Sequence, residues 1–383
     1  MQLATTDNPI SPGKSGIPDF SRNVHCLFGL PFDAVGSDEA VDNILDAVSE
    51  RRRCVLSTPN LNFMVASQDD AAFRDSVIHS DLSVVDGMPL VWAGRCLGVP
   101  FRERVAGSGL FESLHRRNTS QIPVKVYLFG GDQGVADKAC AAINAAGGGV
   151  ECVGHASPGF GSMESMSTPE ILAAINSSGA DFLVVSLGAK KGQAWIEHNI
   201  ARLDPPVVSY LGAVINFMAG TVRRAPPWMQ RNGLEWLWRI SEERGLWKRY
   251  WDDGRQALGL IGKNVAPGLL TYYLDRHRFG TDQASLDVVE TELGIRLSLE
   301  GAWTAASLEP LRQALSRHAD TDKQLHIDLG NVTFIDSSFV ALMVMLRRYR
   351  LDSKRVWYLR NVSTRLKRLL KMYGAADITD RHV

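Results

Sequence analysis

The sequence predicts an α/β protein in which a Rossmann-like, mostly parallel sheet domain is followed by a smaller α/β domain. From residue 26 to about 211, short apolar runs rich in β-branched residues alternate with helical patterns. Such repeats are typical of a parallel sheet covered by helices on both faces. The composition changes after Gly220, and a second, shorter alternation begins near Ser285. We therefore expect a flexible leader at 1–24, a first domain at 25–253, a connector at 254–284 and a second domain at 285–383.

The individual elements follow from this alternation. Predicted strands of the first domain are 54–57, 83–85, 125–129, 149–153, 182–186 and 207–211, and predicted helices are 39–51, 71–80, 134–146, 169–177 and 193–202. Predicted strands of the second domain lie near 295–299, 324–329 and 356–359, and its helices near 305–316, 337–349 and 363–373. Ligands of such sheets bind beyond the carboxyl ends of the strands. The loops that follow the strands are therefore the candidate site.

Composition narrows the class of protein. The 383 residues contain 42 basic and 42 acidic side chains, so the net charge says nothing about partners, and a preference for nucleic acid or membrane must come from local patches. We expect no nucleic-acid partner. The five cysteines are scattered without a C-x-x-C pair, which argues against a disulfide framework and a zinc site and favours small buried side chains in a reducing compartment. The first two dozen residues lack the apolar core of a signal peptide. Since no apolar run is long enough to span a bilayer, we expect a cytoplasmic protein that at most lies on a membrane.

Two loops carry side chains suited to a sugar ligand. Thr58 and Asn60 follow the first predicted strand and offer uncharged hydrogen bonds, although both residue types also cap helices. Asp86 ends the next apolar run and is followed by Gly87. A single carboxylate in this position is typical of a general base for an acceptor hydroxyl, and an Asp-Gly turn is the alternative.

Two further loops are candidates for a diphosphate. Gly130, Gly131 and Asp132 connect a predicted strand to a helix, so backbone N–H groups and a helix N-terminus face the loop. A similar break at Gly188 is followed by two lysines, including Lys191, and by Gln193. Neither loop contains a full G-x-G-x-x-G, so this evidence alone is weak.

The segment 221–253 combines tryptophan and basic residues. It contains five of the nine tryptophans, namely Trp228, Trp236, Trp238, Trp247 and Trp251. It also contains Arg223, Arg224, Arg231, Arg239, Arg244, Lys248 and Arg249. This mixture fits a membrane interface with anionic lipid, and the arginines also suit a nucleotide diphosphate. The alternative is a helical pair packed on the sheet with a solvated basic face.

Taken in order, these motifs resemble the WecG/TagA/CpsF family of bacterial glycosyltransferases. The resemblance covers roughly residues 26–250. The stretches that carry it are Ser57-Thr58-Pro59-Asn60, Val85-Asp86-Gly87-Met88-Pro89-Leu90-Val91-Trp92, Glu103-Arg104-Val105-Ala106-Gly107, Leu128-Phe129-Gly130-Gly131, Arg224-Ala225-Pro226-Pro227-Trp228 and Gly233-Leu234-Glu235-Trp236-Leu237-Trp238-Arg239.

The resemblance implies an inverting, metal-independent transfer from a UDP-sugar to a polyprenyl-diphosphate-linked saccharide at the cytoplasmic membrane face, without a cofactor. It implies Asp86 as the base, and Thr58, Asn60 and Arg104 as substrate-pocket residues. For the nucleotide it implies Gly130, Gly131, Asp132, Gly188, Lys191, Gln193, Arg224, Arg231 and Arg239. The arginines among them match a C-terminal appendage that closes over the site at the membrane.

The chain departs from the family pattern in two places. Where the family usually reads Gly-x-Pro-Lys-Gln-Glu, this chain has Lys190, Gly192 and Gln193 at the Pro, Gln and Glu positions. The family also tends to have Asp where Gly109 stands. These changes point to a different donor sugar or to weakened catalysis.

The second domain resembles a STAS domain, the fold of anti-sigma-factor antagonists and transporter tails. The matching stretch runs from Leu325-His326-Ile327-Asp328-Leu329 to Val332-Thr333-Phe334-Ile335-Asp336-Ser337-Ser338. In that family the serine after Asp can be phosphorylated, so Ser337 is the candidate regulatory residue. Phe339 replaces the usual glycine. The alternative is a domain kept for packing or dimerisation, with Asp336 as a helix cap.

We therefore expect a glycosyltransferase of the hexosyl or N-acetylhexosaminyl type in surface polysaccharide or exopolysaccharide synthesis. Its second domain would serve regulation, binding of a protein partner or self-association. A catalytically weak, nucleotide-binding scaffold regulated through the second domain is the alternative. A dinucleotide-dependent oxidoreductase is disfavoured because no complete dinucleotide fingerprint with a ribose-binding acid is present.

Overall fold

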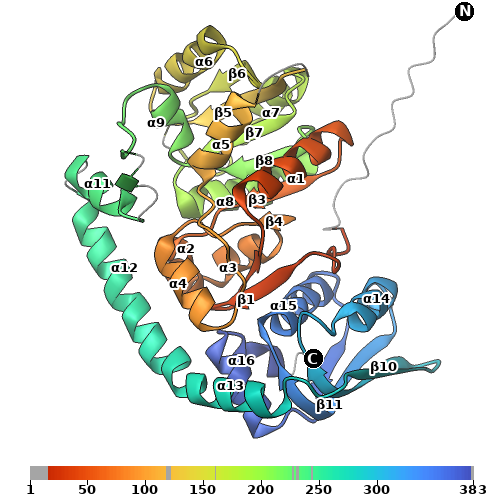
Figure 1. The fold of residues 1–383 in the computed structure, drawn as a ribbon. Coiled ribbons are helices and arrows are strands. Elements are labelled where there is room, and N and C mark those ends of the chain that lie inside the picture. Colours follow the sequence, from red (N-terminus) through yellow and green to blue (C-terminus); the bar gives the residue numbers. More distant parts are fainter. Residues whose placement is uncertain are drawn as a thin grey trace, which may run out of the picture.

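A computed structural model describes residues 16–117, 122–159, 161–226, 228–229, 233–242 and 245–380. A six-stranded sheet domain and a four-stranded C-terminal domain lie at opposite ends of the molecule, and a long curved helical path, α12 to α13, runs along one side from the first to the second (Figure 1). Among the described helices, none is both long and apolar enough to cross a membrane.

The first domain opens with an antiparallel hairpin that the sequence did not predict. Strands β1 (Val24–Leu27) and β2 (Leu30–Asp33) are buried along their whole length. Phe20, which precedes them inside the predicted leader, is fully buried. Packed structure therefore begins before residue 25, where the sequence placed the start of the domain. Residues 1–15 lie outside the described part.

The main sheet has the predicted parallel character, with strand order β4-β3-β8-β7-β5-β6. Its strands are β3 (Cys54–Ser57), β4 (Leu82–Ser83), β5 (Val124–Gly130), β6 (Val150–Ala156), β7 (Phe182–Ser186) and β8 (Val207–Tyr210). Because all of these strands run the same way, their carboxyl ends meet at one edge.

Helices connect the strands. They are α1 (Ser37–Ser49), α2 (Leu61–Asp69), α3 (Ala71–Ile78), α4 (Met88–Cys96), α5 (Gly107–Arg116), α6 (Val135–Ala146), α7 (Pro169–Ser177), α8 (Ala189–Asn199), the short 3-10 helix η1 (Ile200–Arg202) and α9 (Val214–Met218). Local signals explain several starts. Thr168 caps α7 and Pro169 occupies its first turn, an arrangement typical of helix N-termini. Helices α2, α4, α5 and α9 were not predicted.

The predicted connector is helical, which corrects the sequence interpretation. Helix α11 (Glu235–Glu242) is followed by α12 (Leu246–Leu260), a π-helical turn η2 (Ile261–Val265) and α13 (Ala266–Phe279). Gly254, Gly259 and Gly262 weaken the helical pattern in sequence. Burial of Ala257, Val265 and Tyr272 (6%, 5% and 2% exposed) compensates, because tertiary packing supplies most helix stability.

The C-terminal domain has the sheet order β12-β11-β10-β9. Strands β9 (Ser285–Glu290) and β10 (Gly294–Trp303) are antiparallel, whereas β10, β11 (Gln324–Ile335) and β12 (Trp357–Arg360) are parallel. Its helices are α14 (Glu309–His318), α15 (Ser337–Asp352), α16 (Thr364–Met372) and the 3-10 helix η3 (Ala376–Thr379). The edge strand β9 was not predicted.

The two domains share one hydrophobic core. Helix α15 is buried all round, from Ser337 through Leu346, because it packs on its own sheet and also against the hairpin β1–β2. Tyr272 of α13 joins this core, with its ring centroid 5.9 Å from that of Phe334 and 6.4 Å from that of Tyr373. The C-terminal domain is therefore fixed to the first domain rather than carried on a loose connector.

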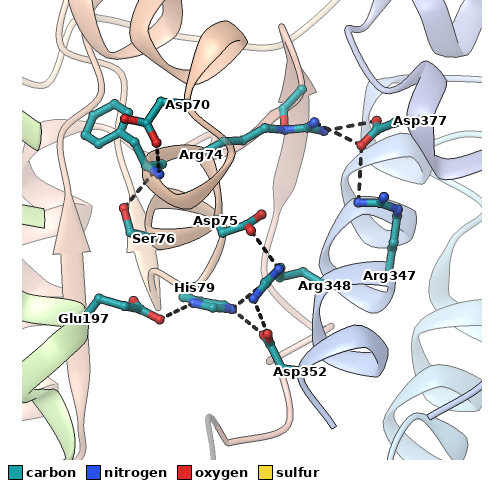
Figure 2. A network of polar contacts seen from close by, with 12 residues as sticks. Asp70, Arg74, Asp75, Ser76, His79, Glu197, Arg347, Arg348, Asp352 and Asp377 are labelled. Atoms are coloured by element: carbon teal, nitrogen blue, oxygen red, sulfur yellow. Dashed lines mark hydrogen bonds and ion pairs between the residues drawn. The ribbon is translucent and has the colours of Figure 1, made fainter. Parts of the chain in front are cut away.

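Charged side chains surround this shared core (Figure 2). Arg74 of α3 reaches Asp377 of η3 at 3.0 Å, and Arg348 of α15 reaches Asp75 of α3 at 2.7 Å. His79, just after α3, lies 2.6 Å from Asp352 of α15 and 2.8 Å from Glu197 of α8. The pairs made by Asp377, Arg348 and Asp352 join the two domains, whereas the contact between His79 and Glu197 lies within the first.

The cysteines differ from the expectation of five unpaired side chains. Cys140 of α6 and Cys152 of β6 form a disulfide, with their Cα atoms 5.3 Å apart. The helix and the neighbouring strand bring these residues together, a proximity that the spacing alone did not reveal. Cys26 and Cys54 are buried and unpaired, as expected, whereas Cys96 is exposed.

Candidate active site

Three loops at the carboxyl edge of the sheet are joined by backbone hydrogen bonds. The N–H of Val84 donates to the carbonyl of Ser57 at 2.9 Å, and that of Asp86 donates to Pro59 at 3.0 Å. The N–H of Val105 donates to Val85 at 2.8 Å. The loops after β3 and β4 and the approach to α5 therefore form one rigid unit around Asp86.

Asp86 lies half-buried in this unit and accepts a hydrogen bond from the backbone N–H of Gly107. Burial raises the pKa of the Asp86 carboxyl to about 6, and the negative charge of Glu235 adds to the rise. The positive charges of Arg104 and Arg239 oppose it. A carboxylate with a pKa just below neutrality is ionised at pH 7 and is basic enough to accept a proton.

Arginines from three separate segments surround Asp86. Arg104 forms an ion pair with Glu235 of α11, at 2.7 Å between Nη2 and Oε2, with both side chains mostly buried. Arg224 is paired with Glu112 of α5 and is close enough to Arg104 and Asp86 for their charges to affect its pKa. Arg239 of α11 acts on Asp86 in the same way. The cluster thus combines the carboxylates of Asp86, Glu235 and Glu112 with three guanidinium groups.

The two polar residues of the loop after β3 differ in their surroundings. Thr58 is 7% exposed and lies beside Gly107, where an added Cβ would come within 3.2 Å of the Thr58 Oγ1. Asn60 caps α2, because its Oδ1 accepts from the N–H of Phe63 at 3.2 Å. Both residues adjoin the Asp86 unit, and the helix-capping alternative holds for Asn60.

The glycines after β5 permit a close approach to β7. Gly130 has φ 112°, and a Cβ there would lie 2.3 Å from the carbonyl oxygen of Ser186. Gly131 donates its N–H to the same carbonyl at 2.9 Å. Only glycine fits this contact. Asp132 is exposed in the loop that leads to α6.

In the segment after β7, Gly188 lies at the sheet edge, whereas the side chains of Lys190, Lys191 and Gln193 contact other parts of the first domain. Gly188 begins α8 with φ 86°. Lys191 donates to the carbonyl of Gly161 at 2.7 Å, and Lys190 pairs with Asp70 at 3.1 Å. Gln193 is 1% exposed, and its Nε2 donates to Ser57 Oγ at 2.6 Å. This burial contradicts a direct contact between Gln193 and a nucleotide; its amide supports the loop that carries Thr58.

Two residues of the cluster were missed as site residues. Glu235 stands within the quoted Gly-Leu-Glu-Trp stretch, and its acidic character among arginines was the available signal. Tyr210 ends β8 at the same edge, and burial raises its pKa although Arg249 and Arg239 oppose the rise. The rule that ligands meet strand ends would have found it. Arg231, Arg244 and Pro227 lie outside the described residues.

Ser337 is far from this edge. It begins α15, is 2% exposed, and its Oγ lies 2.9 Å from Nδ1 of His25 in β1. Asp336 caps the helix by accepting from the N–H groups of Ser338 and Phe339. The predicted regulatory serine is therefore sealed between the domains.

Potential metal ligands do not cluster in the described part of the chain. Within the described ranges, no group of three or more His, Cys, Asp or Glu side chains is arranged to hold a metal ion. Asp253 is instead held by Asn62, whose Nδ2 lies 3.3 Å from both carboxylate oxygens. The arrangement at the sheet edge can accept a proton at Asp86 and can bind a polyanion through its arginines.

Comparison with known proteins agrees with this chemistry. The glycosyl transferase WecG/TagA/CpsF family matches residues 25–266, and the STAS domain, described as "Mlab, STAS domain", matches 287–380. A protein named N-acetylglucosaminyldiphosphoundecaprenol N-acetyl-beta-D-mannosaminyltransferase from Bacillus subtilis strain 168 is 26% identical over 56% of this chain and 81% of its own length. Its namesake from Bacillus spizizenii strain W23 is 26% identical over 51% of this chain and 73% of its own.

Proposed function

Because the chain belongs to the WecG/TagA/CpsF family of glycosyltransferases, we propose that it moves a sugar from a UDP-sugar to a polyprenyl-diphosphate-linked saccharide. The names of the two Bacillus relatives describe transfer of an N-acetylmannosaminyl group to a GlcNAc-diphosphoundecaprenol. The observation that supports the proposal most directly is the ionised, half-buried Asp86 within a cluster of arginines.

The proposed reaction is a single inverting displacement. Asp86 accepts the proton of an acceptor hydroxyl, and the hydroxyl oxygen forms a bond to the anomeric carbon of the donor. The bond between that carbon and the β-phosphate oxygen breaks, and UDP leaves with the electron pair. Atoms and charge balance without a cofactor or a metal ion as reactant.

Arginines would stabilise the departing diphosphate. Arg104, Arg224 and Arg239 all act electrostatically on the Asp86 region, while Glu235 and Glu112 hold two of them in place. Positioned guanidinium groups stabilise charge that develops on a leaving phosphate. The N-terminus of α6, which follows the loop after β5, would receive the nucleotide end of the donor, because the N–H of Gly131 already donates to the Ser186 carbonyl.

Membrane association is part of the proposal. Exposed tryptophans lie on α11 and α12, with Trp236, Trp247 and Trp251 at 44%, 53% and 70% exposure. Lys248 and Arg249 stand among them. Aromatic and basic side chains together suit an interface with anionic lipid. We place the protein at the cytoplasmic face of the membrane, as a peripheral protein in polysaccharide synthesis.

For the C-terminal domain we propose a docking role. The domain packs against α13. Since α13 continues α12 through η2, this contact fixes the C-terminal end of α12 relative to the carboxyl edge of the main sheet. The observation behind this is the shared core and the interdomain ion pairs. Regulation through Ser337 would require the domains to separate first.

The test is a transfer assay on the purified full chain. Labelled UDP-hexoses and UDP-N-acetylhexosamines are offered with GlcNAc-diphosphoundecaprenol, and product lipid is separated and counted. We expect transfer from one donor class, and loss of transfer in Asp86→Asn with retained UDP binding by calorimetry. UDP binding without turnover on any donor would instead support a regulatory scaffold.

A further inference from the structure

An apolar groove of about 410 Å³ lies beside the catalytic loops, outside the charged cluster. One wall is α12, and the other is formed by α2 and α4. Its floor includes Phe28 and Met64, its α4 side includes Leu90, and its α12 side includes Gly254 and Leu258. Of the described residues that line it, Arg255 alone is charged. The volume falls within the range of ligand pockets.

The groove adjoins the candidate active site, because two of the helices that line it begin there. Helix α2 begins at Leu61, directly after Asn60, and Leu61 lines the groove. Helix α4 begins two residues after Asp86, and Pro89 and Leu90 of that helix line it as well. The hydrogen bonds between Asn62 and Asp253 tie α12 to the same unit. The groove and Asp86 are therefore held next to each other by the same short segments.

We propose that this groove binds the first isoprene units of the acceptor's polyprenyl chain, an inference that rests on the proposed function. The acceptor joins a diphosphate to a long apolar chain, so its site needs an arginine-rich part directly beside an apolar part. The charged cluster around Asp86 would bind the diphosphate, and the groove beside it would bind the apolar chain. Arg255, at the groove, can extend its guanidinium toward a lipid phosphate while its stem lies on apolar surface.

The outer rim of the groove leads toward the membrane. Trp251 and Leu258, on the α12 side, are 70% and 71% exposed. Large exposed apolar side chains of this kind mark a surface that meets lipid or a partner. The exposed tryptophans of α11 and α12 belong to the same consecutive pair of helices. A polyprenyl chain can thus leave the bilayer along the rim and bring its diphosphate to the arginines.

Gly254 offers a direct test. A Cβ at this position meets no heavy atom within 4 Å, so Gly254→Phe can place a ring in the groove without a backbone clash. Gly259 has the same open surroundings on the same helix, is exposed, and does not line the groove. Gly259→Phe is therefore the matched control, since both changes replace a poor helix former.

Two acceptors are compared in detergent micelles: GlcNAc-diphosphoundecaprenol and a GlcNAc-diphosphate ester of a short alkyl alcohol. We expect Gly254→Phe to raise the KM for the long-chain acceptor by about tenfold or more, the effect of losing about two buried methylene groups. The KM values for the short-chain acceptor and the donor should stay unchanged. Gly259→Phe should match the wild type with both acceptors.

A binding measurement keeps this test separate from the proposed function. A polyprenyl phosphate carrying a fluorescence quencher is titrated while tryptophan emission is followed, with Trp251 at the groove. Weaker binding to Gly254→Phe than to Gly259→Phe supports the groove even if neither transfers sugar. Equal binding and equal KM in the two variants would overturn it. So would a change of oligomeric state in Gly254→Phe with chain binding intact, which would assign the groove to a second copy.

Discussion

Nδ1 of His25, in the first strand, lies 2.9 Å from Oγ of Ser337, at the start of the helix that is buried between the two domains. Ser338 is within 3.1 Å of the same nitrogen. Burial, with the nearby charge of Arg312, lowers the pKa of His25 to about 4, so the imidazole is neutral near pH 7. The residue that matches a phosphorylated serine in STAS domains is therefore held by a neutral partner inside a buried interface.

A negative charge at Ser337 should loosen this interface. Ser337→Asp at pH 8 places a carboxylate where the neutral His25 cannot compensate it, and an unpaired buried charge costs about 3 kcal/mol of stability. We expect a lower melting temperature and faster proteolysis between the domains. Ser316→Asp, on the exposed face of α14, is the control and should change little. Full phosphorylation of Ser337 in the folded chain without a stability change would contradict the docking role.

The ion pairs around His79 should make the interface sensitive to alkaline pH. Although burial alone would lower it, hydrogen bonds to Asp352 and Glu197 raise the pKa of His79 to about 9. The protonated imidazole is thus favoured in the folded state, and its contribution is complete below the unfolded pKa near 6.5. It is lost as pH rises through 9. The contribution is about 2 kcal/mol, judged from the size of such a shift.

The measurement is urea denaturation of wild type and His79→Gln at pH 6 and at pH 9.5. The wild type should be more stable than the variant at pH 6, and most of that difference should vanish at pH 9.5. His277→Gln, an exposed histidine on α13, provides the control. A difference that is the same at both pH values would show that His79 contributes by packing rather than by charge.

Asp86 should set the acid limb of the activity profile. Since its pKa is about 6, kcat/KM is expected to fall below that pH as the carboxylate becomes protonated. Asp86→Asn should lower kcat by about 10²–10⁴-fold, the usual contribution of a general base. Its melting temperature should not fall, because the amide leaves no buried charge. Rates that stay constant from pH 5 to pH 8 would remove Asp86 from this role.

Much of the fold follows from the sequence alone because the parallel strands are short, mostly apolar and separated by helices. The predicted strands at 54–57 and 182–186 agree with β3 and β7 at both ends. The rule that ligands bind at strand ends also predicts that Thr58, Asp86 and Gly130 lie at one edge of the sheet. Helices α4 and α5 escape prediction because Pro89 and the glycines of α5 obscure their patterns.

The relation between the domains could not be predicted. Helix α15 reads as an apolar helix of a small domain, and its sequence does not reveal that the hairpin β1–β2 covers its second face. The helices α12 and α13 are stabilised because Ala257 and Tyr272 are buried against different domains. Helix propensity depends only on the local sequence and does not include such tertiary contacts. Gln193 was misplaced for a similar reason, since only the folded chain shows its hydrogen bond to Ser57.

Arg104 and Glu235 should shift the acid limb in opposite directions. The positive charge of Arg104 lowers the pKa of Asp86, whereas the negative charge of Glu235 raises it. The acid limb of Arg104→Gln should therefore move to higher pH and that of Glu235→Gln to lower pH, in profiles of kcat/KM. Arg104→Gln should also lose about 10–100-fold in kcat/KM, the value of a charge-assisted hydrogen bond.

The neighbours of Arg104 provide matched controls for these two variants. Arg102 and Glu103 are exposed residues of the same loop and are not among the charges that act most strongly on Asp86, so Arg102→Gln and Glu103→Gln should leave the acid limb nearly in place. If both Arg104→Gln and Glu235→Gln moved the limb in the same direction, the limb would report closure of α11 over the site. The ionisation of Asp86 would then not be its cause, since the ion pair between Arg104 and Glu235 is broken in either variant.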